Sequence, residues 1–444
     1  MKAAKISNER GRGAAHPMDA AAPMRARVAI RIDQVRDALG EVLQWSLPAD
    51  AALSRWLRAH PKLGARDRAE VADAVFDALR HLRRYRHFAQ SGVGAANRRL
   101  GLLALSSVLG GAALDDALAA PERQWLEHIR RVDLSSLPRA VRASLPDWLD
   151  AKLDDLPQAD ALVDALNRTA PLDVRVNPFK LERNALLAEL RGGAGLHHDP
   201  QPTPYSPWGI RLQGRPPVNR WPAFLRGELE VQDEGSQILV ALVAPRRGEM
   251  VIDYCAGAGG KTLLLGALMK STGRLYAFDV SAARLARAKP RFARSGLSNI
   301  VPVVISAGAD RRVKRLSGKA QRVLVDAPCS GLGTLRRNPD LKWRLYPGSL
   351  AQLLETQADI LQQASRCVAP GGRLVYGTCS PLPEENEHQV ERFLQANPDF
   401  TRLDAGPILA DRCKGLTLSG PYLRLRPDQH GTDGFFGAVL ERTR

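Results

Sequence analysis

From Gly248 onward, short apolar runs alternate with stretches of helical periodicity, and this alternation restricts the possible folds more than any other feature of the chain. The apolar runs are VIDYC, RLYAFDV, NIVPVVIS, RVLVDAP and RLVYGTCS, with helical stretches such as SAARLARAKPRFARS between them. Buried strands that alternate with helices predict an α/β fold with a doubly wound, mostly parallel sheet. Because ligands of such sheets bind at the carboxyl ends of the strands, we expect the functional site there.

Three segments precede this α/β domain, which we place at residues 246–444. Residues 1–24 are polar and Gly-rich, without the apolar segment of a signal peptide, and predict a disordered tail. Residues 25–164 show apolar residues at helical spacing and no strand-like alternation, so we expect an all-helical domain. Residues 165–245 contain many of the prolines, which excludes a long helix and predicts a small α+β connector.

The chain is strongly basic. Of its 444 residues, 64 are Lys or Arg and 47 are Asp or Glu, so the formal charge is +17. Such a charge favours a polyanionic partner such as RNA, although a generally basic proteome would also explain it. Two clusters mix basic and aromatic side chains: Arg80, His81, Arg83, Arg84, Tyr85, Arg86, His87 and Phe88, and then Trp208, Arg211, Arg215, Arg220 and Trp221. The first predicts an RNA-facing surface or a solvated helix face, and the second a nucleic-acid contact or a packed loop.

The remaining composition narrows the class of protein. The five Cys form no CxxC pair, which is typical of a reducing, cytoplasmic setting. The nine His form no cluster with Cys or carboxylates, so we expect no metal. An apolar stretch from Leu100 contains Gly110, Gly111, Asp115 and Asp116, which favours a buried helical hairpin over a membrane span. We expect a monomer that does not bind membranes.

A glycine-rich turn follows the first predicted strand of the α/β domain. Cys255, Ala256, Gly257, Ala258, Gly259, Gly260 and Lys261 form this turn, and a helix follows. Glycines allow close backbone approach, and the helix start offers free N–H groups to a nucleotide-type cofactor. Asp279 ends the next strand, where a carboxylate can accept hydrogen bonds from both ribose hydroxyls. The ending GGKT is similar to a phosphate-binding loop, but Cys255 stands where that motif requires glycine.

Two further strands end in DAPCSG, from Asp326, and GTCS, from Gly377. With NPDLKW between them, VQDEGSQ before them and HGTDGFFGAVL near the end, the chain resembles the RNA (cytosine-5)-methyltransferase family of the Sun/Fmu type. This family includes methyltransferases of small-subunit ribosomal RNA. The stretch LGARDRAEVADAVFDALRHLRRYRHF is similar to the family's NusB-like RNA-binding domain. One departure is that the family commonly has CAAPGGKT, whereas this chain has Gly257 and Ala258 in the loop.

The resemblance implies a Rossmann-like class I methyltransferase domain that uses S-adenosyl-L-methionine to methylate C5 of a cytosine in RNA, most of all small-subunit rRNA. This chemistry needs a nucleophile, because C5 becomes reactive only after a thiolate adds to C6. The family's pattern assigns that role to Cys379 and product release to Cys329. It also implies that Asp326 contacts the cytosine ring and that Lys261 contacts this carboxylate or a substrate phosphate. DNA cytosine methyltransferases use the other cysteine, so the assignment of Cys329 as nucleophile stays open.

The expected cofactor-binding residues are Cys255, Ala256, Gly257, Ala258, Gly259, Gly260, Lys261, Asp279, Asp310 and Asp326. Of these, Asp310 would hold the adenine amine. We expect the residues after DAPCSG to position the flanking RNA strand or to form a solvated loop; these are Arg336, Arg337, Lys342 and Trp343. The thiols of Cys255, Cys367 and Cys413 are expected to be inert. Two alternatives remain for the whole chain: a tRNA cytosine-5 methyltransferase, and an inactive RNA-binding assembly factor.

Overall fold

The computed structural model describes residues 17–308 and 310–443. The chain divides into two compact units, Met1–Pro146 and Asp147–Arg444. Of the predicted tail, residues 1–16 lie outside the described residues, and the first helix begins at Pro17. We placed the end of the helical domain at residue 164, whereas the division falls after Pro146, because the helices that follow pack within the second unit.

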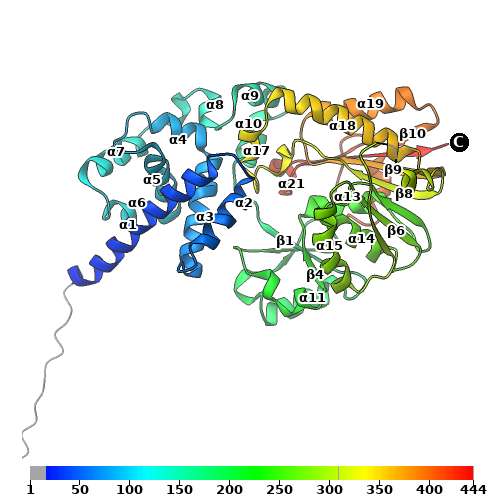
Figure 1. The fold of residues 1–444 in the computed structure, drawn as a ribbon, viewed down its shortest axis with the longest axis horizontal. Helices are drawn as coiled ribbons and strands as arrows, with labels where there is room; N and C mark the ends of the chain where they lie inside the picture. Colours follow the sequence, from blue (N-terminus) through cyan, green and yellow to red (C-terminus); the bar gives the residue numbers. More distant parts are fainter. Residues whose placement is uncertain (1–16, 309, 444) are drawn as a thin grey trace, which may run out of the picture. The chain divides into compact units, whose positions relative to one another are not determined.

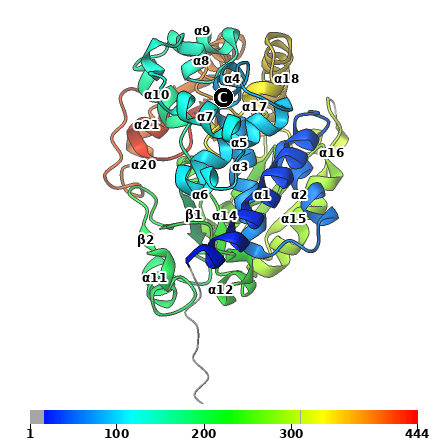
Figure 2. The same cartoon turned by 90° about the vertical axis from the view of Figure 1, so that its left-hand side faces the viewer.

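The first unit is helical throughout its described part, as the apolar spacing predicts. Its helices are α1 (Pro17–Val42), α2 (Ala49–Ala59), α3 (Ala65–Arg80), α4 (Leu82–Phe88), α5 (Ala96–Leu109), α6 (Gly111–Asp115), α7 (Ala120–Arg130) and α8 (Arg139–Arg142). Helices α1, α3 and α5 lie side by side (Figures 1 and 2). Val71, Val75 and Leu79 of α3 are fully buried between its neighbours. Gly110, with φ of +81°, ends α5. No helix in the described part of the chain has the length and hydropathy needed to cross a membrane.

The basic cluster of residues 80–88 is partly buried, so it exposes less basic surface than the predicted RNA-facing stretch. Arg80 and the rings of Tyr85 and Phe88 are buried. Arg83 donates a hydrogen bond of 2.6 Å to the backbone oxygen of Leu145. Exposed cationic side chains remain at Arg86 and His87. The cluster therefore stabilises the helical unit and offers only a small basic surface.

The second unit begins with two helices, which the sequence analysis places in the helical domain, and a small antiparallel sheet, which corresponds to the predicted α+β connector of residues 165–245. Its elements are α9 (Asp147–Asp154), α10 (Ala159–Leu166), β1 (Leu172–Val176), α11 (Arg183–Gly192), β2 (Gln201–Pro202), β3 (Gly209–Leu212), α12 (Pro222–Leu225) and β4 (Leu229–Val231). The strand order is β2-β3-β1-β4. Trp221 is buried and Trp208 packs beside it against the core of this small sheet. The packing of the two tryptophans thus favours a packed loop, which is one of the two alternatives given for this stretch.

The α/β domain contains an eight-stranded sheet in which the predicted apolar runs form the central strands. These strands are β5 (Met250–Asp253), β6 (Arg274–Asp279), β7 (Ile300–Val304), β8 (Ala320–Asp326), β9 (Val368–Thr378), β10 (Phe400–Leu403), β11 (Leu423–Leu425) and β12 (Phe435–Arg442). The order is β10-β12-β9-β8-β5-β6-β7, with β11 paired to β12. Strands β5 to β9 pair in parallel, and β10, β11 and β12 add antiparallel pairs at one side.

Helices cover both faces of this sheet, so the domain has three layers (Figure 1). One face carries α13 (Glu234–Val243), α14 (Gly260–Leu268), α15 (Ala282–Ser295) and α20 (Ala405–Leu409). The other face carries α16 (Arg311–Lys314), α18 (Pro347–Ser365) and α19 (Glu387–Ala396). The remaining helices are α17 (Leu341–Arg344) and α21 (Pro427–His430). The 3-10 turns of the described chain are Leu134–Ser136, Leu196–His198, Val218–Arg220, Leu332–Thr334 and Pro383–Glu385. The predicted fold class, a Rossmann-like doubly wound sheet after a helical domain and a connector, is confirmed.

Candidate active site

The glycine loop between β5 and α14 brings backbone N–H groups beside a carboxylate. Gly257 and Gly259 have φ of +56° and +80°, a region that glycine enters without strain. The N–H of Gly257 donates to Oδ2 of Asp279 at 2.8 Å, so the end of β6 touches the loop. A Cβ on Gly257 would meet nothing within 4 Å, so there is open space above this turn. An acidic side chain and open space beside free backbone fit a ribose-bearing cofactor.

The two cysteines of the site come from neighbouring strand ends. Strands β8 and β9 are parallel, with Asp326 opposite Gly377, and the DAPCSG and GTCS turns therefore leave the sheet side by side. The Sγ atoms of Cys329 and Cys379 are 3.4 Å apart. The backbone N–H of Cys379 also points to Sγ of Cys329 at 3.4 Å. Both side chains are partly exposed, so both sulfurs border the same site.

Burial and hydrogen bonding give the groups of this site different charges. The hydrogen bond with Cys379, followed by burial, raises the pKa of Cys329 well above its ordinary value, so this thiol stays protonated at neutral pH. Lys261 Nζ donates to Oδ2 of Asp326 at 2.7 Å. Burial alone would lower the pKa of Lys261, but the Asp326 carboxylate outweighs it and the net direction is upward. The lysine therefore stays charged beside the two thiols, with its Nζ 5.3 Å from the ring centroid of Phe435.

Comparison with known proteins identifies the family to which this chain belongs. The model of the 16S rRNA methyltransferase RsmB/F family matches residues 240–441, and a RsmF/B-like ferredoxin-like domain matches residues 145–219. The probable ribosomal RNA small subunit methyltransferase B of Synechocystis is 33% identical over 353 residues, which are 77% of this chain and 75% of the relative. The chain belongs to the RsmB/F family. The ribosomal RNA small subunit methyltransferase B of Sodalis glossinidius is 36% identical and covers 73% of this chain and 68% of its own length.

Solved structures agree with this placement in the RsmB/F family. The crystal structure of PH0851 aligns with 93% of this chain and 99% of its own, with a TM-score of 0.75 and 25% identity. NSun6 from Pyrococcus horikoshii, solved with SFG, covers 67% of this chain and 98% of its own at a TM-score of 0.59. At 21% identity, that likeness speaks for the fold alone. The family and its named members make the chain an RNA methyltransferase, a class of enzyme that depends on S-adenosyl-L-methionine.

A buried carboxylate that the sequence did not reveal joins the two cysteine turns of this RsmB/F protein. Glu385 is fully buried and accepts hydrogen bonds from the N–H of Ser330 at 2.7 Å and from its hydroxyl at 2.5 Å. The same carboxylate accepts from Nε2 of Gln357 at 2.9 Å, and the hydroxyl of Ser330 lies 3.1 Å from that of Ser380. Glu385 follows Cys379 by six positions, but an acid in a Pro-rich loop gives no signal that it is buried.

Asp310 lies at a helix start, where local hydrogen bonds account for its carboxylate. It accepts from the N–H of Ser306 at 2.9 Å and from the N–H of Arg312 at 2.7 Å. The side chain of Arg312 also binds it, and this hydrogen bond is the first cause that lowers the pKa of Asp310. Asp310 thus caps α16, and its described contacts do not reach the glycine loop.

The basic residues after DAPCSG do not form the solvated or RNA-facing loop that we expected. Arg336 is buried and donates to the backbone oxygens of Gly431 at 3.0 Å and Thr432 at 2.9 Å. Lys342 is fully buried and donates to Oδ1 of Asn167 at 2.9 Å. Arg337 binds two carboxylates, as described below. These cations hold segments of the second unit together, and their sequence neighbours gave no sign of the acids and carbonyls that surround them.

Proposed function

We propose that this chain methylates C5 of a cytosine in small-subunit ribosomal RNA through a covalent bond between Cys379 and C6 of the base. The observation that supports this most is the pair of sulfurs 3.4 Å apart at adjacent strand ends, with the ion pair of Lys261 and Asp326 beside them. A pair of thiols in contact and a carboxylate–ammonium pair in contact match the needs of cytosine activation, addition and release.

The reaction starts at C6. The thiolate of Cys379 donates an electron pair to C6, and the ring electrons move toward N3, where the carboxyl of Asp326 holds the ring and Lys261 offsets the developing charge. C5 has then become nucleophilic. S-adenosyl-L-methionine supplies the electrophilic methyl group. A base or a water molecule at the site takes the C5 proton, the electrons of the C5–H bond form the C5–C6 double bond, and the Cys379 thiolate leaves C6, which releases the methylated base.

The raised pKa of Cys329 argues against this thiol as the nucleophile and leaves Cys379 for that role. A thiol attacks as its thiolate, and the raised pKa of Cys329 keeps that group neutral. A neutral thiol at 3.4 Å can instead donate a proton to the leaving sulfur of Cys379. We therefore assign addition to Cys379 and release to Cys329.

The residues at the glycine loop fit the cofactor. We propose that residues 255–261 hold it through backbone N–H groups, that Asp279 binds its ribose, and that Asp326 borders its reactive end. Asp310 is left out of this set, because its carboxylate is engaged at the start of α16.

The substrate assignment rests on the names of the relatives and on the charge of +17. A base-modifying enzyme requires a target nucleotide that has left its stack. The cavity of about 880 Å³ behind the Cys379 turn is lined in part by Ser380, Gly434 and Phe435 but by neither proposed catalytic thiol, so the site of the base is assigned from Cys379 itself. We propose that the chain acts as a monomer on a loop or partly unfolded segment of rRNA.

A mechanism-based trap tests this function. RNA that contains 5-fluorocytidine has no removable proton at C5, so an enzyme that has added to C6 and methylated C5 stays attached. We expect a denaturation-resistant adduct with the wild type and with Cys329→Ala, and none with Cys379→Ala, as read by gel electrophoresis after incubation with S-adenosyl-L-methionine.

The choice of RNA separates the alternatives in the same experiment. Small-subunit rRNA transcripts should form the adduct and tRNA transcripts should not. An adduct on tRNA alone would reassign the substrate, and no adduct on either would favour an inactive assembly factor. An adduct that survives Cys379→Ala but disappears with Cys329→Ala would reverse the roles of the two thiols.

A further inference from the structure

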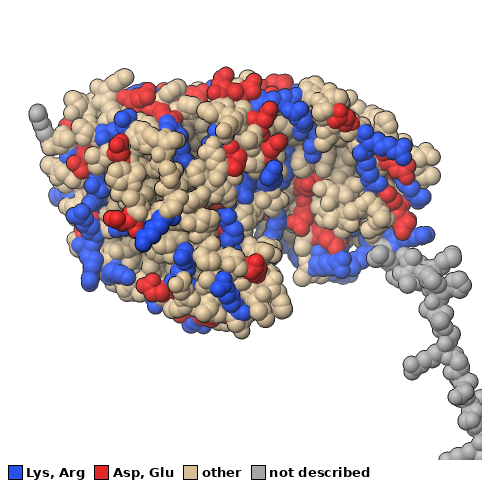
Figure 3. Space-filling model, turned by 180° about the vertical axis from the view of Figure 1, so that it is seen from behind, with Lys and Arg blue, Asp and Glu red and all other residues tan. Residues whose placement is uncertain are grey.

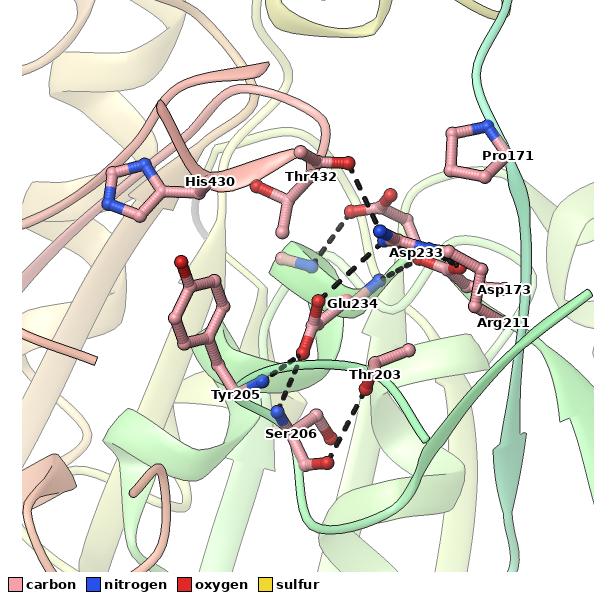
Figure 4. Close-up of polar contacts among 12 residues, drawn as sticks. Pro171, Asp173, Thr203, Tyr205, Ser206, Arg211, Asp233, Glu234, His430 and Thr432 are labelled. Atoms are coloured by element: carbon pink, nitrogen blue, oxygen red, sulfur yellow. Dashed lines mark hydrogen bonds and ion pairs between the residues drawn. The ribbon is translucent and has the colours of Figure 1, made fainter. Parts of the chain in front are cut away.

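A cluster of buried and half-buried charged side chains lies where the small sheet meets the α/β domain, and Figure 4 shows part of it. Its members come from β1, β3, the start of α13, the loop after β8 and the turn before β12. We call it the charge cluster; it comprises Asp173, Arg211, Asp233, Glu234, Arg336, Arg337 and Asp433. Nothing in the proposed chemistry requires these charges, and yet burying charges is costly unless they are closely paired.

Arg337 joins two carboxylates of this cluster that are far apart in sequence. Its Nε donates to Oδ2 of Asp433 at 2.6 Å, and its Nη2 donates to Oδ2 of Asp233 at 2.9 Å. Its Nη1 donates to the backbone oxygen of Pro171 at 3.0 Å, so all three guanidinium nitrogens have partners. A planar guanidinium fixes the orientation of the groups that it binds, which a point charge does not.

From Asp433, a chain of contacts runs to the backbone of Cys379. The N–H of Asp433 donates to the carboxylate of Asp233 at 3.2 Å. The N–H of Gly434 donates to the oxygen of Gly333 at 2.8 Å, and the N–H of Gly333 donates to the oxygen of Cys379 at 2.9 Å. The turn before β12 is therefore attached to the turn that carries the proposed nucleophile.

The residue after Gly434 lies against the proposed catalytic lysine. The ring of Phe435 has its centroid 5.3 Å from Nζ of Lys261, and that atom binds Asp326. A Cβ on Gly235 would lie 2.7 Å from Phe435, so the start of α13 fits closely under the ring. Asp233 caps that same helix through the N–H of Gly235 at 2.8 Å. The position of the ring thus depends on the place where Asp233 and Asp433 are held together.

Arg337 keeps the carboxyl of Asp433 joined to the start of α13. Asp433 is almost fully buried, and burial, then Asp233, raises its pKa to about 7. The Arg337 guanidinium acts in the opposite direction and favours the charged form. Removal of the guanidinium would raise the pKa of Asp433 further, so that its carboxyl binds a proton at neutral pH, and would remove the donor that connects Asp433 to Asp233.

We propose that Arg337 is a positioning residue for methyl transfer: by joining Asp233 to Asp433 it holds Phe435 on Lys261 and the Gly333–Gly434 contact behind Cys379. The effect reaches the reaction through Lys261 and Cys379, so the inference rests on the proposed function. It predicts a defect in the chemical step and not in the binding of either substrate.

The test compares Arg337→Met with a matched control, Arg322→Met. Arg322 is likewise an arginine that pairs with a carboxylate, that of Glu249 at 3.3 Å, and it is more buried than Arg337, but it lies near the start of β8, whereas the site is at the end of that strand. The full chain is used, and transfer of a tritiated methyl group to small-subunit rRNA is measured, which counts methyl transfer whatever base receives it. For Arg337→Met we expect kcat to fall by about tenfold or more, with KM for RNA and for cofactor within about twofold of the wild type.

Two further measurements separate positioning from loss of stability. Arg322→Met should lower the melting temperature as much as Arg337→Met does but keep kcat within about twofold. Arg337→Lys, which can pair with one carboxylate, should recover part of kcat. Equal losses of kcat in the two Met variants, or a wild-type kcat in Arg337→Met, would overturn the proposal. If the wild type transfers methyl groups but forms no fluorocytidine adduct, the covalent mechanism fails while the Arg337 comparison still stands or falls by its own result.

Discussion

At the scale of single residues, Asp253 makes the stability of the folded chain depend on pH. It ends β5, is almost fully buried, and accepts a hydrogen bond of 2.7 Å from the hydroxyl of Thr262. Burial, with smaller effects of Asp326 and Asp279, raises its pKa to about 7. Because the folded-state pKa lies above the unfolded value, the folded chain binds this proton more tightly. The contribution of Asp253 to stability is therefore full at acid pH and is lost as the pH rises toward 7.

Replacement of this acid by its amide should remove that pH dependence. Asp253→Asn keeps an oxygen for Thr262 but does not ionise. Relative to the wild type, we expect its free energy of unfolding to rise by about 2 kcal/mol between pH 5 and pH 8. Urea denaturation of both proteins at the two pH values measures this difference. The same gap at both pH values would show that Asp253 does not titrate in the folded chain.

Single residues also show which features of the site could be predicted from the sequence and which could not. Strand ends and motif spacing predicted that Cys329, Cys379 and Asp326 lie together, and the contact of Lys261 with Asp326 was expected too. The burial of Glu385 and the ion pairs of Arg337 could not be predicted, because their partners come from other segments of the chain. The sequence gives the type of a polar residue, but only the fold decides whether it faces water or another charge.

At the scale of elements, the contact between two turns depends on glycine. A Cβ on Gly333 would lie 2.4 Å from the oxygen of Gly434 and 2.8 Å from the oxygen of Cys379. Both are backbone atoms, so no side-chain rotation relieves the clash. Gly406 in α20 offers a contrast, because a Cβ there meets nothing within 4 Å.

Replacement of each of these two glycines by alanine should therefore have different effects on stability. Gly333→Ala should lower the free energy of unfolding by about 1–3 kcal/mol and reduce methyl transfer, because the Cys379 turn must move. Gly406→Ala should be neutral or stabilise by up to about 1 kcal/mol. Thermal unfolding and the methyl-transfer rate measure both. A wild-type rate in Gly333→Ala would show that the turns do not need this contact.

Among the elements, the parallel strands could be predicted and the antiparallel ones could not. Strands β5, β6, β8 and β9 are continuous apolar runs, since both of their faces are buried. Strand β12 appeared in the sequence only as the HGTDGFFGAVL motif. Its place beside β9 depends on long-range pairing, for which neither run contains a local signal.

At the scale of the whole molecule, the positive charge is spread and not gathered. Figure 3 shows Lys and Arg side chains interspersed with Asp and Glu over the face it presents. Many arginines of the described chain are engaged in ion pairs, including Arg31, Arg98, Arg130 and Arg226. RNA affinity should therefore come from scattered phosphate contacts in addition to the catalytic site.

Salt should weaken RNA binding, and the steepness of this salt dependence should report the number of phosphate contacts. For the full chain, the logarithm of the RNA association constant should fall linearly with the logarithm of salt concentration. Arg86→Ala, at an exposed cation of the helical unit, should make this slope shallower by about one. Filter binding across a salt series gives both slopes. Identical slopes would show that this part of the helical unit does not touch the RNA backbone.

The position of strand β12 in the sheet has a consequence for folding during synthesis. It is the last described strand to be synthesised, yet it lies between β9 and β10, and β10 pairs with it alone in the described sheet. The edge of β9 therefore stays uncovered until Phe435–Arg442 has been synthesised, and open edges of this kind invite aggregation. Nascent chains should thus need protection by a chaperone until this later strand has paired with β9.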